Sequence, residues 1–194
     1  MAPVPSRRGR PRSAQADEAI LDAAIEVFAE AGFEGLTVEG VAARAGVGKA
    51  TVYRRYPGKV DLVLAAAACL TEQQAPHVDT GSTADNLRAL GRSLVHLLTD
   101  TPIGRIAPAM VAESQRNPEL GDAHRRFVAA RRLGSMTIVR QGIARGDLRA
   151  DADPEIVVDF FAGPIFYRFL ISGGPLDDAF VDRLVHATMR AFGV

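Results

Sequence analysis

The chain has 194 residues, with 23 acidic and 23 basic side chains, and 47% of its residues are hydrophobic. This length allows one or two domains with a core that needs no metal or disulfide, and the composition excludes a disordered or fibrous protein. The longest uncharged run, residues 62–71, is half the length of a membrane span of about 20 residues, and the basic first twelve residues lead into no secretory signal. The single cysteine, Cys69, forms no internal disulfide. We therefore expect a cytoplasmic protein that does not contact membranes.

The net charge of zero hides an uneven distribution of charge along the first sixty residues. Residues 1–12 carry a net charge of +4, residues 13–36 carry −6, and residues 37–60 carry +4. An acidic helix therefore separates two basic patches.

Helical spacing of apolar residues begins at residue 15 and predicts a first helix that ends near Ala31, before Gly32. Thr37 is a suitable N-cap for a short second helix over residues 38–45, which Gly46 stops. A third short helix is expected over residues 49–56 and a longer fourth helix over residues 59–74. The first four predicted elements are thus all helices.

The remaining residues also have helical spacing and contain no alternating strand pattern. The expected helices cover residues 84–99, 102–116 with Pro102 in the first position, 119–145, 154–171 with a kink at Gly163-Pro164, and 176–192. The fold class is therefore all-α with about nine helices. We expect a basic arm over residues 1–14, a first domain over residues 15–60 and a second domain over residues 61–194.

Residues 38–56, VEGVAARAGVGKATVYRRY, have the spacing of a helix-turn-helix. Ala42 lets the two helices approach, Gly46 allows the turn, and Val47 and Val52 fix the second helix. The second helix of such a unit enters the major groove of DNA. The candidate contacts to base edges are Lys49, Ala50 and Thr51, and the candidate contacts to the DNA backbone are Tyr53, Tyr56 and Lys59.

The run from Ile20 through AEAGFEGLTVEGVAARAGVGKATVYRRYPGKVDLVLAA resembles the DNA-binding domain of the TetR-type (TetR/AcrR) bacterial transcriptional regulators. The resemblance implies a three-helix DNA-binding head, a connecting fourth helix, a helical ligand-binding body and a dimer formed by the last two helices. It also implies Thr37 as a further DNA contact. Gly48 stands where the family often has serine, so a side-chain contact to phosphate is missing at this position.

The N-terminal arm contains Arg8 and Arg10 around a glycine and before a proline. Such a pattern suits the narrow minor groove of A·T-rich DNA, where the potential is most negative. A basic tail that adds only non-specific affinity would have the same composition. Both interpretations of Arg8 and Arg10 stay open.

Other chemistries have little support in the sequence. The GVGK run lacks the glycine and the hydroxyl residue of a phosphate-binding loop, since Ala43 and Ala50 occupy those positions. The four histidines lie on different predicted helices, so neither a metal site nor a cofactor is expected. The alternatives left open are a constitutive DNA-binding protein without a ligand and an all-helical enzyme built on the C-terminal body.

The sequence therefore predicts a ligand-responsive repressor that binds a palindromic operator in double-stranded DNA as a homodimer. The helix over residues 153–171 is apolar around its circumference, so a second subunit is expected to cover part of it. The expected dimer contacts are Phe160, Ile165, Phe169, Phe180, Leu184 and Thr188. A pocket for a small apolar or amphipathic ligand is expected in the body. The residues expected to line this pocket are His96, Met110, Phe127, Met136 and Phe161.

Overall fold

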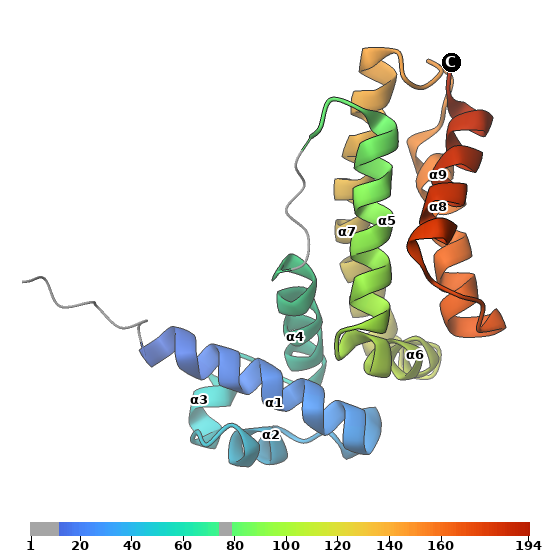
Figure 1. The fold of residues 1–194 in the computed structure, drawn as a ribbon. Helices are drawn as coiled ribbons and strands as arrows, with labels where there is room; N and C mark the ends of the chain where they lie inside the picture. Colours follow the sequence, from blue (N-terminus) through green and yellow to red (C-terminus); the bar gives the residue numbers. More distant parts are fainter. Residues whose placement is uncertain (1–11, 74–78) are drawn as a thin grey trace, which may run out of the picture. The chain divides into compact units, whose positions relative to one another are not determined.

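The structure is a computed structural model that describes residues 12–73 and 79–194, and within these ranges the regular structure is helical (Figure 1). Nine α-helices and one π-helical turn cover the described part of the chain, which confirms the all-α class. The chain divides into two compact units, Met1–Cys69 and Leu70–Val194, whereas the sequence suggested a boundary after Val60. None of the described helices is both long enough and apolar enough to span a bilayer.

The first unit contains α1 (Arg12–Gly35), α2 (Val38–Arg44), α3 (Lys49–Tyr53) and most of α4 (Lys59–Gln73). Its core is built from fully or almost fully buried side chains of all four helices: Ile20, Ala24, Phe28, Val41, Val52 and Leu62. The helical assignment of α1 extends past Ala31 across a kink at Gly32, where φ is 67° and ψ is −175°. This backbone conformation is open to glycine alone, so Gly32 breaks the helix where the sequence predicted its end.

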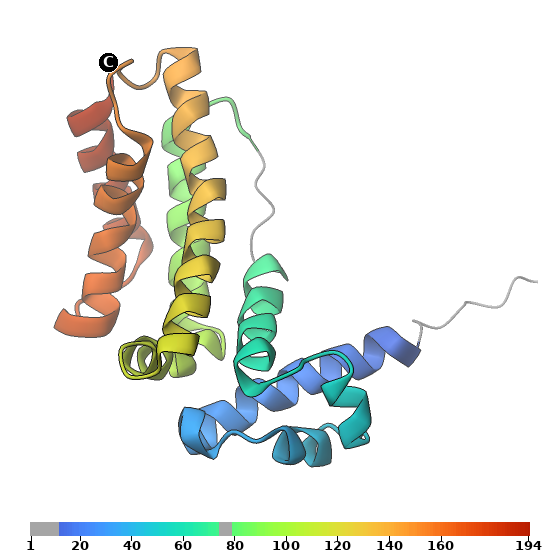
Figure 2. The same cartoon turned by 180° about the vertical axis from the view of Figure 1, so that it is seen from behind.

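The second unit contains α5 (Thr83–Thr99), α6 (Ile103–Ser114), α7 (Pro118–Arg145), α8 (Pro154–Tyr167) and α9 (Asp178–Phe192). Within this unit α5 packs against α6, α7 and α9, and α8 packs against α7 and α9. Figures 1 and 2 show α8 and α9 side by side along one flank of α5 and α7. The α8 and α9 pair therefore forms one edge of the second unit.

Several helix boundaries differ from those expected, and α3 ends at Tyr53 rather than at residue 56. Pro102 is the N-cap of α6, which begins at Ile103. Helix α8 continues through Pro164 and ends at Tyr167, where the π-helical turn Arg168–Ser172 follows. Pro164 has no N–H to donate, and the irregular turn begins one helical turn after it. Helix α9 begins at Asp178, because Asp177 caps it by accepting a hydrogen bond from the N–H of Phe180 at 2.7 Å.

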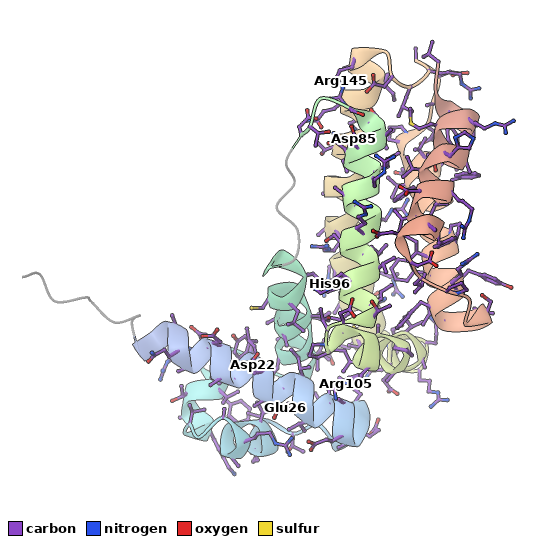
Figure 3. The ribbon with its side chains drawn as sticks, in the orientation of Figure 1. Asp22, Glu26, Asp85, His96, Arg105 and Arg145 are labelled. Atoms are coloured by element: carbon purple, nitrogen blue, oxygen red, sulfur yellow. The ribbon has the colours of Figure 1, made fainter. Side chains whose placement is uncertain are left out.

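A polar cluster joins the start of α5 to the end of α7, and Figure 3 shows Arg145 at this end of the unit. The carboxylate of Asp147 accepts hydrogen bonds from the Thr83 hydroxyl at 2.8 Å and the Thr83 N–H at 3.0 Å. Arg145 donates to Asp147, Asp79 and Thr83. The hydrogen bonds from Thr83, followed by those from Arg145, lower the pKa of Asp147 below its usual range. These contacts hold the first residues after the undescribed segment 74–78 against the second unit.

Helix α5 crosses α8 and α9 at Gly91, where no larger residue fits without a shift. A Cβ atom at Gly91 would lie 2.8 Å from Cγ1 of Val181 and 3.1 Å from Cζ of Phe161. Both neighbours are almost completely buried, so neither can turn away into solvent. The absence of a side chain at Gly91 thus permits this crossing.

We expect Gly91→Ala to lower the free energy of unfolding by about 1–3 kcal/mol, because the added methyl overpacks a filled crossing. Gly134→Ala is the matched control, since Gly134 lies within α7 and its Cβ would meet no atom within 4 Å. Alanine there should raise the free energy of unfolding by about 0.5–1 kcal/mol through helix propensity. Urea denaturation of both variants measures the two effects. Equal stabilities of the two variants would contradict the close crossing.

Candidate nucleic-acid interface

The helix-turn-helix of the first unit is built by local contacts at both ends of α2. The Thr37 hydroxyl caps α2 by accepting a hydrogen bond from the N–H of Gly40 at 3.0 Å. Gly46 has a φ of 66°, a left-handed conformation that lets the chain leave α2 and turn toward α3. The N–H of Val47 then donates to the Ala42 carbonyl at 3.0 Å, which closes the turn. Thr37 is therefore a helix cap in this structure, and its hydroxyl oxygen acts as the acceptor.

Helix α3 has five residues and is held to the unit by its inward side. Val52 is completely buried, whereas Lys49, Ala50 and Tyr53 are exposed and Thr51 is half-buried. Because the buried valine fixes the rotation of the helix, the residues expected to contact DNA lie toward solvent. Four of the candidate contacts are thus brought together on one short helix.

Ion pairs to α1 orient α2 and the end of α3. Arg44 donates to both carboxylate oxygens of Glu30, at 2.6 and 2.7 Å, and Arg55 lies 2.8 Å from Asp17. The hydrogen bond from Arg44 lowers the pKa of Glu30 and raises the pKa of Arg44 itself. The acidic residues of α1 therefore engage two arginines of the helix-turn-helix, which leaves Arg54 exposed at the end of α3.

Tyr56 and Lys59 are less available than the sequence suggested. The Lys59 ammonium donates to the Phe33 carbonyl at 3.1 Å and lies 4.2 Å above the centre of the Phe33 ring. Tyr56 is half-buried, and burial, followed by the charge of Asp17, raises the pKa of its hydroxyl. Both residues therefore contribute to the packing of the first unit. Arg8 and Arg10 of the N-terminal arm lie outside the described residues.

A residue that the sequence reasoning missed lies beside the candidate contacts. Glu39, in the first turn of α2, has a carboxylate oxygen 3.5 Å from the ammonium of Lys49. Both side chains are well exposed, at 48% for Glu39 and 63% for Lys49. Ten residues separate them in the sequence, so only the packing of α2 against α3 shows that they meet.

The five residues expected to line a ligand pocket have different surroundings in the structure. Met136 packs in a core cluster with Leu148 and Val157, and Phe161 packs against Gly91. Met110 is buried on α6, and Phe127 is half-buried on α7. The expectation that His96 faces inward is wrong for the second unit, because its imidazole is 53% exposed and lies 3.1 Å from the Asp100 carboxylate four residues later. Among the described residues no group of three histidine, cysteine or carboxylate side chains could hold a metal ion.

Four of the six expected dimer contacts are already buried inside one subunit. Ile165, Phe180, Leu184 and Thr188 point into the core of the second unit, so they are not free to meet a partner. Sequence periodicity could not tell which side of an apolar helix faces the core. Phe169 is half-buried, and Phe160 is exposed. The outer apolar face of α8 and the π-helical turn instead consists of Ile156, Phe160, Phe166, Tyr167, Leu170 and Ile171.

Comparison with known proteins matches both units to one family. The family model for bacterial regulatory proteins of the tetR family matches residues 20–66, and the model for the tetracyclin repressor-like C-terminal domain matches residues 77–188. The transcriptional regulator YdeS of Bacillus subtilis is 35% identical over 188 residues, which is 96% of this chain and 93% of the relative. The DNA-binding transcriptional repressor TetR of Mycobacteroides abscessus is 31% identical over 180 residues, or 92% of each chain.

Solved structures agree with this assignment. The TetR-family transcription regulator SCO0332 superimposes with a TM-score of 0.76 at 33% identity, covering 91% of this chain and 97% of that one. The transcriptional regulator FadR of Bacillus subtilis, solved in complex with stearoyl-CoA, has the same fold, with a TM-score of 0.68 at 20% identity over 89% of this chain and 97% of its own. These relatives are regulators and not enzymes, so the enzyme alternative is set aside. The chain belongs to the TetR family of bacterial transcriptional regulators.

Proposed function

We propose that this protein is a homodimeric repressor that binds a palindromic operator through α3 of each subunit and is released from DNA by a small apolar or amphipathic molecule. The observation that carries this proposal is the exposed group Lys49, Ala50 and Tyr53, which the buried Val52 turns toward solvent. The repressor named among the relatives supports repression as the outcome of binding. The protein would act in the cytoplasm, where a bacterial operator lies.

The chemistry of the exposed group suits the major groove. Lys49 and Thr51 carry donors and an acceptor that can meet base edges, whereas Tyr53 and Arg54 can donate to phosphate oxygens. Lys59 uses one of its three N–H groups on the Phe33 carbonyl, so two remain for a phosphate. The Thr37 hydroxyl, Tyr56 and the arm residues Arg8 and Arg10 are further backbone or minor-groove contacts in this proposal.

A dimer follows from the outer apolar face of α8 and the π-helical turn. Within this face Ile156 is 55% exposed, Tyr167 is 59% exposed and Ile171 is 72% exposed. Large exposed apolar patches on soluble proteins mark interaction sites, and a second copy of the same face is the simplest partner for a symmetric oligomer. Two-fold symmetry of the protein would require two-fold symmetry of the operator, with half-site centres about 34–36 Å apart or a multiple of this.

Ligand binding has support from polar atoms buried in the second unit. The Nδ1 atom of His124 and the Oε1 atom of Gln141 are buried and have no hydrogen-bond partner among the described residues. Burial, followed by the charge of Arg125, lowers the pKa of His124, which favours the neutral imidazole. Buried polar atoms without partners are uncommon, and His124 supports a ligand contact by itself, because Gln141 lies about 25 Å further along α7. In this proposal Met110 and Phe127 are candidate apolar neighbours of such a ligand.

We expect genomic DNA to contain a fragment that the protein protects as two symmetric half-sites. A mobility shift of that fragment with fatty acids, acyl-CoA thioesters and flavonoids tests release, and one class should weaken binding at least tenfold. His124→Leu should reduce this response without changing the affinity for DNA alone, because it removes the neutral ring nitrogen. Protection of symmetric half-sites with no release by any compound would favour a constitutive DNA-binding protein.

Lys59→Met separates the two roles of this side chain. Methionine keeps an apolar stem over Phe33 but loses the amine, so the free energy of unfolding should fall by about 1 kcal/mol. If the remaining donors meet phosphate, the slope of log affinity against log salt should become shallower by about one. Arg116→Met, which removes an exposed charge in the second unit, is the control and should leave the slope unchanged. A slope unchanged in Lys59→Met would restrict Lys59 to a structural role.

Tyr167→Glu should convert the dimer to a monomer, because it places a charge in the outer apolar face at a position where folding does not bury it. The interface should be of the large, hydrophobic class of about 2,000 Å² or more, so operator affinity should fall greatly with the dimer. Val111→Glu, which changes an exposed apolar residue on α6, is the matched control. Sedimentation velocity measures the oligomeric state of each variant, and thermal melts show whether each variant is folded. A monomeric wild type at micromolar concentration would contradict both the dimer and the palindrome.

A further inference from the structure

The exposed ion pair between Glu39 of α2 and Lys49 of α3 fits one particular base pair. We propose that the two side chains together recognise a G·C pair in each half-site, the Lys49 ammonium donating to guanine and the Glu39 carboxylate accepting from cytosine. This inference rests on the proposed function, because it requires α3 to enter the major groove. It adds Glu39 as a specificity-determining residue of the operator contact.

The pair joins different helices from those joined by the ion pairs of Arg44 and Arg55. Arg44 and Arg55 are paired with acidic residues of α1, and the Arg55 side chain is only 20% exposed. Glu39 and Lys49 instead belong to the two helices of the helix-turn-helix itself, and neither is shielded from solvent. An exposed ion pair at 3.5 Å contributes little to stability. Glu39 and Lys49 can therefore separate and bind new partners with little loss of free energy. The pair is therefore available for recognition.

Glu39 is also not needed to cap α2. The N–H of Gly40 is already satisfied by the Thr37 hydroxyl at 3.0 Å. A carboxylate on a surface that approaches DNA repels phosphate unless it meets a hydrogen-bond donor. In the major groove the amino group of cytosine is such a donor, and aspartate or glutamate is its usual acceptor. The position of Glu39 beside Lys49 thus favours cytosine as its partner.

The spacing of the two charged groups matches the edge of a G·C pair. Guanine presents two neighbouring acceptors, N7 and O6, and the N4 amino donor of cytosine lies next to O6, at the roughly 2.9 Å of their Watson–Crick hydrogen bond. The ammonium and the carboxylate are 3.5 Å apart, in the complementary order of donor and acceptor. An A·T pair also presents an acceptor beside a donor, at N7 and N6 of adenine, but it gives the ammonium only one neighbouring acceptor where guanine gives two. The pair should therefore discriminate G·C from A·T.

The pair also has zero net charge, which affects binding to unrelated DNA. In the free protein Lys49 is neutralised by Glu39, so it should release little counterion on non-specific phosphate contacts. Removal of the carboxylate frees the ammonium for any phosphate. Loss of Glu39 should therefore raise affinity for unrelated DNA while it lowers selectivity.

The test uses the full-length dimer and duplexes built on the sequence that the wild type selects from a random pool. Each base pair of the half-site is replaced symmetrically, and affinities for these duplexes are measured at one salt concentration for wild type, Glu39→Ala, Lys49→Ala, the double variant and Thr51→Ala. Affinities for unrelated DNA are measured over a series of salt concentrations. Glu34→Ala removes an exposed acidic residue elsewhere in the first unit and is the charge control. Glu39→Gln keeps the size of the side chain, and thermal melts report folding of every variant.

We expect the wild type to lose about tenfold or more in affinity when one G·C pair is replaced by A·T. Glu39→Ala and Lys49→Ala should each remove most of this preference at the same base pair, with no further loss in the double variant, and Thr51→Ala should affect a different pair. Glu39→Ala, but not Glu34→Ala, should also steepen the salt dependence on unrelated DNA.

Two results would overturn the inference. One is a Glu39→Ala variant that changes its affinity for all sequences by the same factor, which would make the carboxylate a general charge. The other is an effect of Glu39→Ala and Lys49→Ala on different base pairs. In both cases the sequence preference of the wild type across the half-site would still support the proposed operator binding. A wild type that selects no sequence would contradict both proposals.

Discussion

The burial of Val52 is the interaction on which the proposed DNA-contacting surface depends. Helix α3 has five residues, and a helix of this length has no stability of its own in water. Its position comes from the side chain of Val52, which is fully buried, as are Ile20, Val41 and Leu62 of the other helices of the unit. The buried valine sets the rotation of α3, so the orientation of its exposed side chains derives from the core beneath it.

The charge pattern of the first sixty residues has a structural explanation. The acidic residues of α1 meet the arginines that lie inside the helix-turn-helix unit: Glu30 pairs with Arg44, and Asp17 pairs with Arg55. Asp22 lies along the same helix, and its pKa is raised by burial and by its acidic neighbours (Figure 3). These pairs orient α2 and α3 against α1. The acidic residues of α1 therefore orient α2 and α3, while Lys49 and Arg54 stay exposed.

The second unit combines tight packing with an uncovered edge. Gly91 lets α5 approach α8 and α9, and the buried residues of those helices fill the space around it. The C-terminal residues are tied to the turn after α7, where the N–H of Arg149 donates to the Phe192 carbonyl at 2.9 Å. Helix α8 thus has one side fixed in the core and an apolar side facing out. The same packing that stabilises the subunit therefore aligns the face proposed for the dimer.

The sequence by itself determined those features that depend on neighbours along the chain. The helix-turn-helix, the cap at Thr37 and the turn at Gly46 were predicted, because caps and turns are set by residues within one helical turn of each other. The all-α class followed in the same way from the spacing of apolar residues.

Only the tertiary structure decided which side of each helix is covered and which distant residues meet. Periodicity marked α8 as apolar all round, but it could not show that Ile165 faces the core while Tyr167 faces solvent. The contacts of Lys59 with Phe33, and of Lys49 with Glu39, join different helices. His96 was expected to face inward from its apolar sequence neighbours, and the structure exposes it beside Asp100. Such contacts depend on how helices pack in three dimensions, and the pattern within a single helix carries no information about its partners.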